Sequence, residues 1–431
     1  MKLKNFSIEN YRSFKSITID LADNLTLIVG KNGAGKTTIL DAIGTILRTV
    51  AARGNTISIP ELYTEDINDK LNNSITFSFE VLIHDGSTIQ QSINFPKSND
   101  GKDSLEYSKI FSLKNDLTKY IFDDEKNTLL PYMFAYYSAQ RCLPKNINST
   151  GKEYDTPKAI FESGFTPSID FSTSLAWFDA KDAEEARLRS KKRDFTLFDP
   201  ELNAVRDAIT RSFYGDIYEF PHMDGTPPQL YITHKMSGQD FKVTQLSEGY
   251  RTMLALVMDL ARRMAAAKLK IFPDSTAPAL EAPGIVLIDE IELHLHPAWQ
   301  QTVIPTLMKI FPNIQFIITT HSPQVVSSVK PEHILIIDQG LVIPTQSCTY
   351  GAETNAILRD IFGVTRPPND ATEKLTTYLN YINSGKGTSK KAKALRAELE
   401  LLMRGDPTLE TADRMLLRKS ARTKRTRGSN A

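Results

Sequence analysis

The sequence lacks the marks of several protein classes. It has 431 residues but only two cysteines, Cys142 and Cys348, which stand far apart and without metal-type spacing. This excludes a disulfide framework and favours a reducing compartment. No apolar run reaches membrane-spanning length, and the first residues lack the apolar core of a signal peptide. We therefore expect a cytosolic, cytoplasmic protein without a membrane partner.

An excess of charge of either sign is also missing, except near the end of the chain. Lys and Arg number 52 and Asp and Glu number 51, so the whole chain gives no electrostatic argument for a nucleic-acid partner. After Asp413, however, acidic residues almost vanish. The basic residues of this tail are Arg414, Arg418, Lys419, Arg422, Lys424, Arg425 and Arg427. The tail predicts either contacts with phosphates or a solvated, disordered end.

The most informative stretch is a glycine-rich loop between an apolar strand and a helix. Residues 25–30 form a β-branched run of strand length, and apolar residues recur with helical spacing over residues 36–53. The phosphate-loop pattern G-x-x-x-x-G-K-[ST] is filled here by Gly30, Gly35, Lys36 and Thr37. In such a loop backbone N–H groups surround a triphosphate, the lysine reaches the β- and γ-phosphates, and the hydroxyl ligates Mg²⁺.

Two acids follow a second apolar strand. Residues 284–289 (GIVLID) are typical of a buried strand, and Asp289 and Glu290 stand at its carboxyl end. In an open α/β sheet, ligands bind at that edge. Asp289 can hold the Mg²⁺ that Thr37 also contacts, and Glu290 can orient or deprotonate the attacking water.

Two further segments point to the same site. Ser247 and Gly249 open a predicted helix and present a hydroxyl and backbone N–H groups at its positive end, although a plain N-cap has the same pattern. His321 follows the apolar strand at residues 315–319, so its imidazole is expected at the same sheet edge, near the nucleotide.

Taken in order, these motifs resemble the ATP-binding-cassette (ABC) ATPase head in its chromosome-maintenance and repair branch, the class of RecF, Rad50, SMC and the overcoming-lysogenization-defect nucleases. The resemblance implies ATP and Mg²⁺ as ligands and Glu290 and His321 as catalytic residues. The implied nucleotide-binding residues are Gly30, Asn32, Gly33, Gly35, Lys36, Thr37, Thr38, Arg12 and Gln140. The implied Mg²⁺ ligands are Thr37, Asp289 and Gln140. The implied signature motif, which contacts the γ-phosphate of the opposite protomer, is Ser247, Glu248 and Gly249.

The expected fold class is α/β, a P-loop NTPase head with a parallel core sheet, an antiparallel β layer and a compact helical insert. Alternation over residues 74–95 predicts the antiparallel layer, with a hairpin turn at Asp85 and Gly86. Helices are expected over residues 179–192, 202–213 and 297–310, and the charges of the first are interpreted as a solvated face. The expected domains are residues 1–145 and 236–345 for the head, 146–235 for the insert, and 346–431 for a C-terminal helical region that binds a partner.

The chain has neither a long coiled coil nor a long C-terminal extension, and in this it resembles the ATPase subunits (PtuA type) of Septu anti-phage systems, including those linked to retrons. The resemblance implies ATP hydrolysis, a homodimer or higher homo-oligomer, and control of a separate HNH-type nuclease, with no nuclease domain in this chain. Two alternatives stay open. One is a repair-type clamp that binds DNA through the basic tail, and the other is a scaffold that hydrolyses ATP very slowly.

Overall fold

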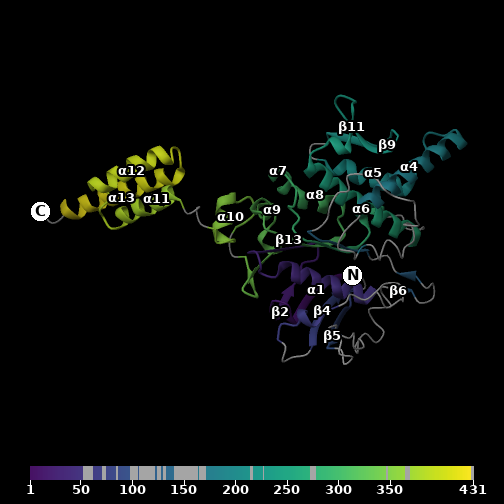
Figure 1. Cartoon of the computed structure of the whole chain (residues 1–431), viewed down its shortest axis with the longest axis horizontal. Coiled ribbons are helices and arrows are strands. Elements are labelled where there is room, and N and C mark those ends of the chain that lie inside the picture. Colours follow the sequence, from purple (N-terminus) through teal and green to yellow (C-terminus); the bar gives the residue numbers. More distant parts are fainter. Residues whose placement is uncertain are drawn as a thin grey trace. The chain divides into compact units, whose positions relative to one another are not determined.

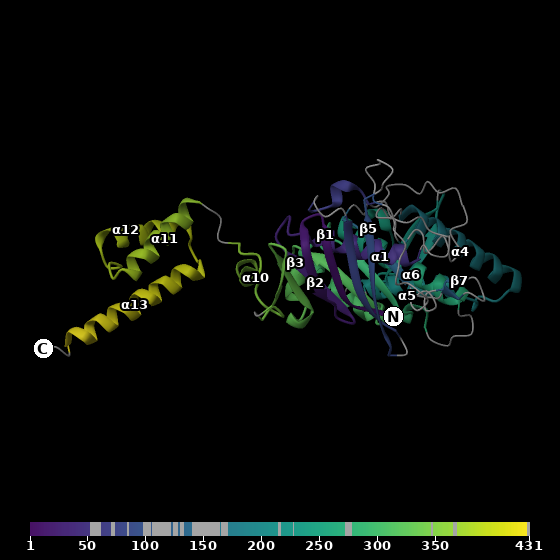
Figure 2. The same ribbon diagram turned by 90° about the horizontal axis from the view of Figure 1, so that it is seen from below.

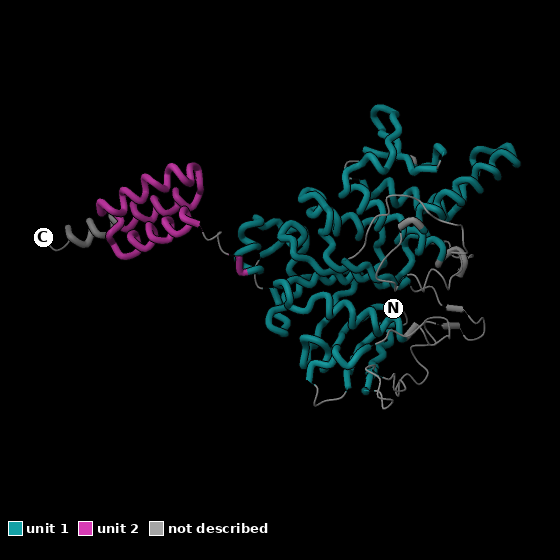
Figure 3. The backbone as a smooth tube through the Cα atoms, viewed as in Figure 1, with its two compact units in different colours: residues 1–362 teal, residues 363–431 magenta. Residues whose placement is uncertain are grey.

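The computed structural model describes residues 1–51, 62–69, 74–83, 86–97, 105, 122–123, 128–129, 133–139, 164, 171–213, 217–226, 228–271, 278–345, 348–364 and 369–428. The chain divides into two compact units, Met1–Phe362 (unit 1) and Gly363–Ala431 (unit 2), shown in Figure 3. The division falls later than the boundary at residues 345 and 346 that the sequence suggested. No helix in the described ranges combines the length and apolarity needed to cross a membrane.

A six-stranded sheet forms the centre of unit 1, and all its neighbouring strands pair in parallel except at the β15 edge. Its strands, in spatial order, are β15 (Leu341–Pro344), β14 (Ile334–Asp338), β3 (Leu25–Gly30), β13 (Ile314–Thr320), β12 (Gly284–Ile288) and β8 (Met133–Tyr137). Apolar residues fill β3, β12 and β13 without a polar alternation because both faces of the sheet are buried. The parallel register places the carboxyl ends of β3, β12 and β13 together.

One face of the central sheet meets helix α1 (Lys36–Ala51) and an antiparallel sheet, drawn in purple and blue in Figure 1. The antiparallel sheet has the order β2 (Phe14–Asp20), β1 (Lys2–Tyr11), β4 (Ser74–Leu82) and β5 (Thr88–Pro96). Ile285 and Leu287 of β12 join the core on this side, together with apolar residues of α1 and β1. The expected antiparallel layer is confirmed; Asp85 of its predicted turn lies outside the described residues.

The opposite face of the sheet packs against helices, and Val286 and Ile288 of β12 point into their core. These helices are α4 (Phe171–Lys192), α5 (Pro200–Ser212), α6 (Glu248–Ile271) and α8 (Val303–Ile310). A small antiparallel sheet joins them, with strands β9 (Tyr218–Asp224), β10 (Gln229–His234) and β11 (Asp240–Lys242). The sequence did not predict β9, because its residues YEFPHMD contain a proline and do not alternate cleanly.

The helix expected over residues 297–310 is two helices, α7 (Pro297–Gln300) and α8. Pro305 has no N–H to bond to the carbonyl of Gln301, and the Thr302 N–H instead donates to Trp299 O at 3.0 Å, so the helix breaks between Gln300 and Val303. The other short elements of unit 1 are η2 (Thr64–Asp66), β6 (Phe122–Asp123), β7 (Thr128–Leu129), η4 (Val243–Gln245), η5 (Ala279–Glu281), α9 (Pro323–Ser327), η6 (Pro331–His333) and α10 (Thr354–Asp360).

Unit 2 contains three helices around a small apolar core: α11 (Asp370–Asn383), α12 (Lys390–Leu402) and α13 (Pro407–Gly428). Leu375, Tyr378 and Ile382 of α11 pack with Leu399 of α12 and with residues of α13. The Arg396 guanidinium on α12 donates to both carboxylate oxygens of Asp413 on α13, at 2.7 to 3.0 Å. The basic residues after Asp413 lie on α13, which extends to Gly428.

Candidate functional site

The phosphate loop connects β3 to α1, and glycines are required at two of its turns. Gly35 has φ +94°, and a Cβ there would lie 2.4 Å from Phe14 Cζ. Gly30 has no positive φ, but a Cβ there would lie 2.4 Å from the carbonyl oxygen of Ile337 on β14. Gly33 also has a positive φ, and with Asn32 it lies exposed at the loop's outer surface. The other strands thus hold the loop closely from both sides.

Lys36 is buried at the centre of the loop. Its Nζ donates to Gly30 O at 3.1 Å and to Lys31 O at 3.2 Å, and it lies 3.5 Å from Nδ1 of His321. Burial lowers the pKa of Lys36, while the carboxylates of Asp289, Glu290 and Glu292 oppose that shift. The loop therefore holds its cation at the end of the sheet, close to three carboxylates, where phosphates can replace the two carbonyl partners.

Asp289 connects three chain segments at the end of β12. The Thr37 hydroxyl on α1 donates to its Oδ2 at 2.9 Å, and the Thr319 hydroxyl on β13 donates to its Oδ1 at 2.5 Å. Asp289 is 2% exposed. A hydroxyl and a carboxylate directed at each other are hard oxygen donors, so the side chains of Thr37 and Asp289 fit a Mg²⁺ that takes its remaining ligands from phosphates and water. Thr38, the next residue, is half-buried at the start of α1.

Glu290 and His321 are positioned by neighbours that sequence patterns did not reveal. Glu290 has φ +47°, and its N–H donates to Thr319 Oγ1 at 2.8 Å. The Glu292 carboxylate accepts from the His321 N–H at 2.5 Å and from the Thr320 hydroxyl at 2.7 Å. Burial, followed by the charge of Lys36, lowers the pKa of His321. We call the phosphate loop with Asp289, Glu290 and His321 the cis half.

The signature segment, Ser247–Gly249, lies at the start of α6. Ser247 and Glu248 are exposed at the start of α6, and Glu248 Oε1 lies 3.3 Å from Nδ1 of the exposed His294. Gly249 is buried against the chain after β12, where a Cβ would lie 3.3 Å from His294 O and 3.4 Å from His296 N. Among the described residues no hydrogen bond or ion pair connects the signature segment to the cis half. Its exposed face is directed outward.

One predicted nucleotide-binding residue, Arg12, bonds outside this cluster. Arg12 has φ +47° and donates from Nε to Asp66 Oδ1 at 2.9 Å and from Nη1 to Asp41 Oδ2 at 2.5 Å. Asp41 lies on α1 and also accepts from the Tyr136 hydroxyl at 2.7 Å. Arg12 therefore joins β1 to the helix behind the phosphate loop. Gln140 lies outside the described residues.

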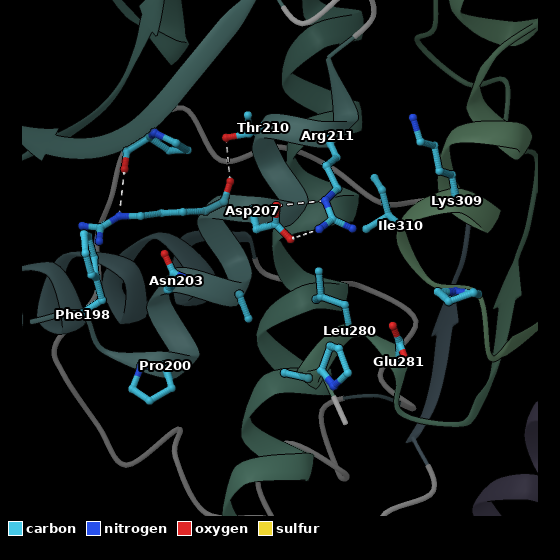
Figure 4. A pocket seen from close by; sticks show the side chains of 16 residues that line it. Phe198, Pro200, Asn203, Asp207, Thr210, Arg211, Leu280, Glu281, Lys309 and Ile310 are labelled. Carbon is cyan, nitrogen blue, oxygen red and sulfur yellow. Dashed lines mark hydrogen bonds and ion pairs between the residues drawn. The ribbon is translucent and has the colours of Figure 1, made fainter. Parts of the chain in front are cut away.

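A separate cavity of about 720 Å³ lies between α5, η5 and α8. Figure 4 shows Phe198 and Asn203 on one side and Arg211 and Lys309 on the other, with Arg211 bonded to Asp207 at 2.7 Å. None of the predicted site residues lines it. The candidate site is therefore the sheet edge at the phosphate loop, where the predicted residues gather.

A phosphate loop followed by a helix, with an Asp–Glu pair on a parallel strand nearby and a histidine on the adjoining strand, defines an ABC-type ATPase head. The comparison with protein families agrees: the model described as "AAA domain, putative AbiEii toxin, Type IV TA system" matches residues 25–327. The chain belongs to this family, whose fold implies nucleotide binding.

Curated relatives narrow the branch. The chain is 28% identical to "Retron Ec83 probable ATPase" of Escherichia coli over 93% of this chain and 83% of the relative. It is 28% identical to "Retron Vc95 probable ATPase" of Vibrio cholerae serotype O1 biovar El Tor, over 79% and 74% of the two chains. "Septu protein PtuA" of Bacillus thuringiensis is 23% identical over 85% and 86%. The resemblance to ABC-type ATPase heads of the Septu-like branch is confirmed.

Three positioning residues escaped prediction from sequence. Thr319 lay within the expected strand, and Glu292 begins residues 292–297 (ELHLHP) just after the paired acids, but neither had a predicted role. Asp41 lay unremarked on the helix after the loop. The one sequence feature that could have indicated a role for them was their position next to predicted site residues. Glu292 follows the paired acids, and Thr319 ends the strand before His321. Which strands pair decides what these side chains contact, and no local pattern gives that pairing.

Proposed function

We propose that this ATPase assembles with a second copy of itself into composite ATP sites, each combining the cis half of one copy with the signature segment of the other. One observation carries the proposal. A single chain brings Lys36, Thr37, Asp289 and His321 into one hydrogen-bonded cluster, yet leaves the signature segment exposed and directed outward. The phosphates held by one chain would then be contacted by the helix start of another.

Within the cis half each residue has a definable role. Lys36 exchanges its two carbonyl partners for β- and γ-phosphate oxygens, and the N–H groups of Gly33, Gly35 and Thr38 face the phosphates. Thr37 and Asp289 hold Mg²⁺, which when bound neutralises charge on the phosphates. Glu290 orients the attacking water and accepts its proton. His321 has a lowered pKa and is neutral at pH 7, so its imidazole can accept or donate a hydrogen bond near the γ-phosphate.

The signature segment supplies the condition for switching. Ser247 and the N–H groups at the start of α6 bind a γ-phosphate only while it is attached to the nucleotide held by the other copy. Hydrolysis removes this contact and weakens the dimer, so the two nucleotide states differ in assembly. Gly249 packs against the backbone at residues 294–296. A contact that moves the signature segment would therefore also move the segment that follows Glu290.

The proposed output is control of a separate HNH-type nuclease in anti-phage defence. Relatives named as Septu protein PtuA and as retron ATPases support this assignment. Unit 2 is the proposed docking region for that nuclease, because it has its own core and exposes Leu401 (86%) and Leu417 (68%).

The experiment is native mass spectrometry of the wild type and of Glu290→Gln, each with and without Mg-ATP. The variant keeps the shape of the side chain but loses the base, so we expect a persistent ATP-bound dimer and turnover reduced by about 10²–10⁴-fold. A variant that stays monomeric with ATP bound would overturn the composite site. A wild type whose turnover is no faster than that of Glu290→Gln would instead favour a nucleotide-gated scaffold.

Control of a nuclease needs its own test. The tagged chain is expressed together with the genes beside it, and the purified material is sized with and without ATP. A stoichiometric complex with an HNH-type protein is expected, and its cleavage of DNA should differ between the ATP-bound Glu290→Gln variant and Lys36→Met. Identical cleavage by both complexes would remove the control function and leave the composite ATP site intact.

A further inference from the structure

The end of helix α4 is an exposed, basic projection. We define the α4 tip as residues 187–195, the last turns of α4 and the start of the loop to α5. Figures 1 and 2 both show one end of α4 extending beyond the other helices of unit 1. The side chains of Arg187, Lys191 and Lys192 are exposed there, as is Arg193, which ends the helix with φ +52°.

The structure separates charges that are mixed in the sequence. Of the acids just before the tip, Asp182 and Glu185 face α5 and bind Arg206, with Glu185 Oε1 at 2.8 Å from its Nη1, while Glu184 is exposed one turn before Arg187. Glu185 is 3% exposed, and it also lies 2.9 Å from Arg189. The carboxylates of Asp182 and Glu185 are therefore neutralised internally. The charged residues at this end of α4 are exposed, as the interpretation of a solvated face expects, and most of them are basic.

Apart from Arg189, which pairs with Glu185, the cations at the tip are exposed. Within the described part of the chain, Arg187, Lys191 and Lys192 form no ion pair. Arg187 and Lys191 stand one turn apart on the face opposite Glu185, so they point away from the core. The one acid of the tip, Asp194, accepts from the Thr196 N–H at 2.9 Å and from its hydroxyl at 2.6 Å. The tip carries a clear excess of positive charge.

Exposed aromatic rings follow the cations directly. Phe195 is 79% exposed and Phe198 is 53% exposed. The Arg189 guanidinium covers Phe198, at 4.5 Å from the ring centroid, while Phe198 also borders the cavity of Figure 4. The tip thus presents an accessible aromatic face next to exposed cations.

We propose that the α4 tip binds single-stranded nucleic acid, with Arg187, Lys191 and Lys192 contacting phosphates and Phe195 stacking on a base. Lysines are depleted from the cores of protein–protein interfaces, whereas cations beside exposed aromatic rings are typical of surfaces that bind single strands. The ring favours a single strand over a duplex, because bases stacked within a duplex leave no face for Phe195. Nothing in this proposal depends on ATP turnover.

The test measures binding of the full-length chain to fluorescently labelled oligothymidylate by anisotropy over a range of salt concentrations. The triple variant Arg187→Gln, Lys191→Gln and Lys192→Gln keeps the helix propensity and removes three charges. We expect the slope of log K against log salt to become shallower by about 2, since each phosphate contact contributes about 0.7. Phe195→Ala should weaken binding to the single strand about tenfold and leave binding to a matched duplex unchanged.

The matched control is the triple variant Lys390→Gln, Lys391→Gln and Lys393→Gln, which removes three exposed cations from α12 in unit 2. It should keep the wild-type salt slope. The proposal is overturned if both triple variants bind oligothymidylate with the wild-type slope. It is also overturned if the wild type binds no single strand at low salt.

Discussion

The two halves of the proposed ATP site differ in how the chain holds them. In the cis half, hydrogen bonds from β3, β13 and α1 fix Lys36, Thr37 and Asp289, and two of these three residues are buried. The signature segment has one packed residue, Gly249, and two exposed ones. In the proposed function, nucleotide would bind to one chain and complete its contacts only with a second, so assembly would depend on the ligand.

The most damaging change should be Lys36→Met, which removes the cation that the cis half is built around. We expect turnover to fall at least ~100-fold, because no other described cation is placed to contact the β- and γ-phosphates together. Phosphate release and binding of a fluorescent ATP analogue measure the loss. Lys31→Met is the control, since Lys31 is exposed and only its carbonyl contacts Lys36. Equal effects of both changes would contradict the assignment of Lys36.

Ser247→Arg should stop turnover by blocking contact between the two copies, because it places a bulky side chain on the face that meets the second copy. The decisive experiment mixes this variant with Lys36→Met. Half of the resulting dimers pair the two variants, and each of those has one intact composite site, so about a quarter of the wild-type rate should return. Complementation is measured as ATPase rate against mixing ratio. No recovery at any ratio would mean that both segments act within one chain.

A smaller effect is expected from Thr319→Val, which removes the hydroxyl that donates to Asp289 and accepts from the Glu290 N–H. Because side chains behind a metal ligand fix its orientation, the Mg²⁺ concentration for half-maximal turnover should rise about 10–100-fold. Thr320→Val is the matched control: it is equally buried but bonds Glu292 instead. The same increase in required Mg²⁺ for both variants would contradict a specific role of Thr319 in orienting Asp289.

The smallest effect concerns pH. Burial and the nearby Lys36 lower the pKa of His321 below its ordinary value of about 6.5. The unfolded chain therefore binds a proton here at pH values where the folded chain does not, so this group makes the protein less stable as pH falls below about 6.5. In His321→Gln, the unfolding midpoint should change less steeply over that acidic range. A slope equal to that of the wild type would show that His321 does not carry this dependence.

Sequence patterns could predict the cis half because its main residues follow local rules. Strand, glycine loop and helix are contiguous over residues 25–51, and the acids end a strand whose apolar run is plain. Thr319 could not be assigned, since its contact with Asp289 depends on β12 pairing with β13 in one register. Likewise, the pairing of Asp182 and Glu185 with Arg206 depends on how α4 packs on α5, and only this packing leaves the α4 tip basic.

The close approach of Phe14 to Gly35 and of the Ile337 carbonyl to Gly30 has an energetic consequence. Neighbouring strands keep the loop in its curved shape without help from a ligand, so little conformational entropy is lost when a triphosphate enters. Free energy released by those phosphate contacts is then not consumed in ordering the loop. Under the proposed function, that free energy would remain available to favour the association of two heads.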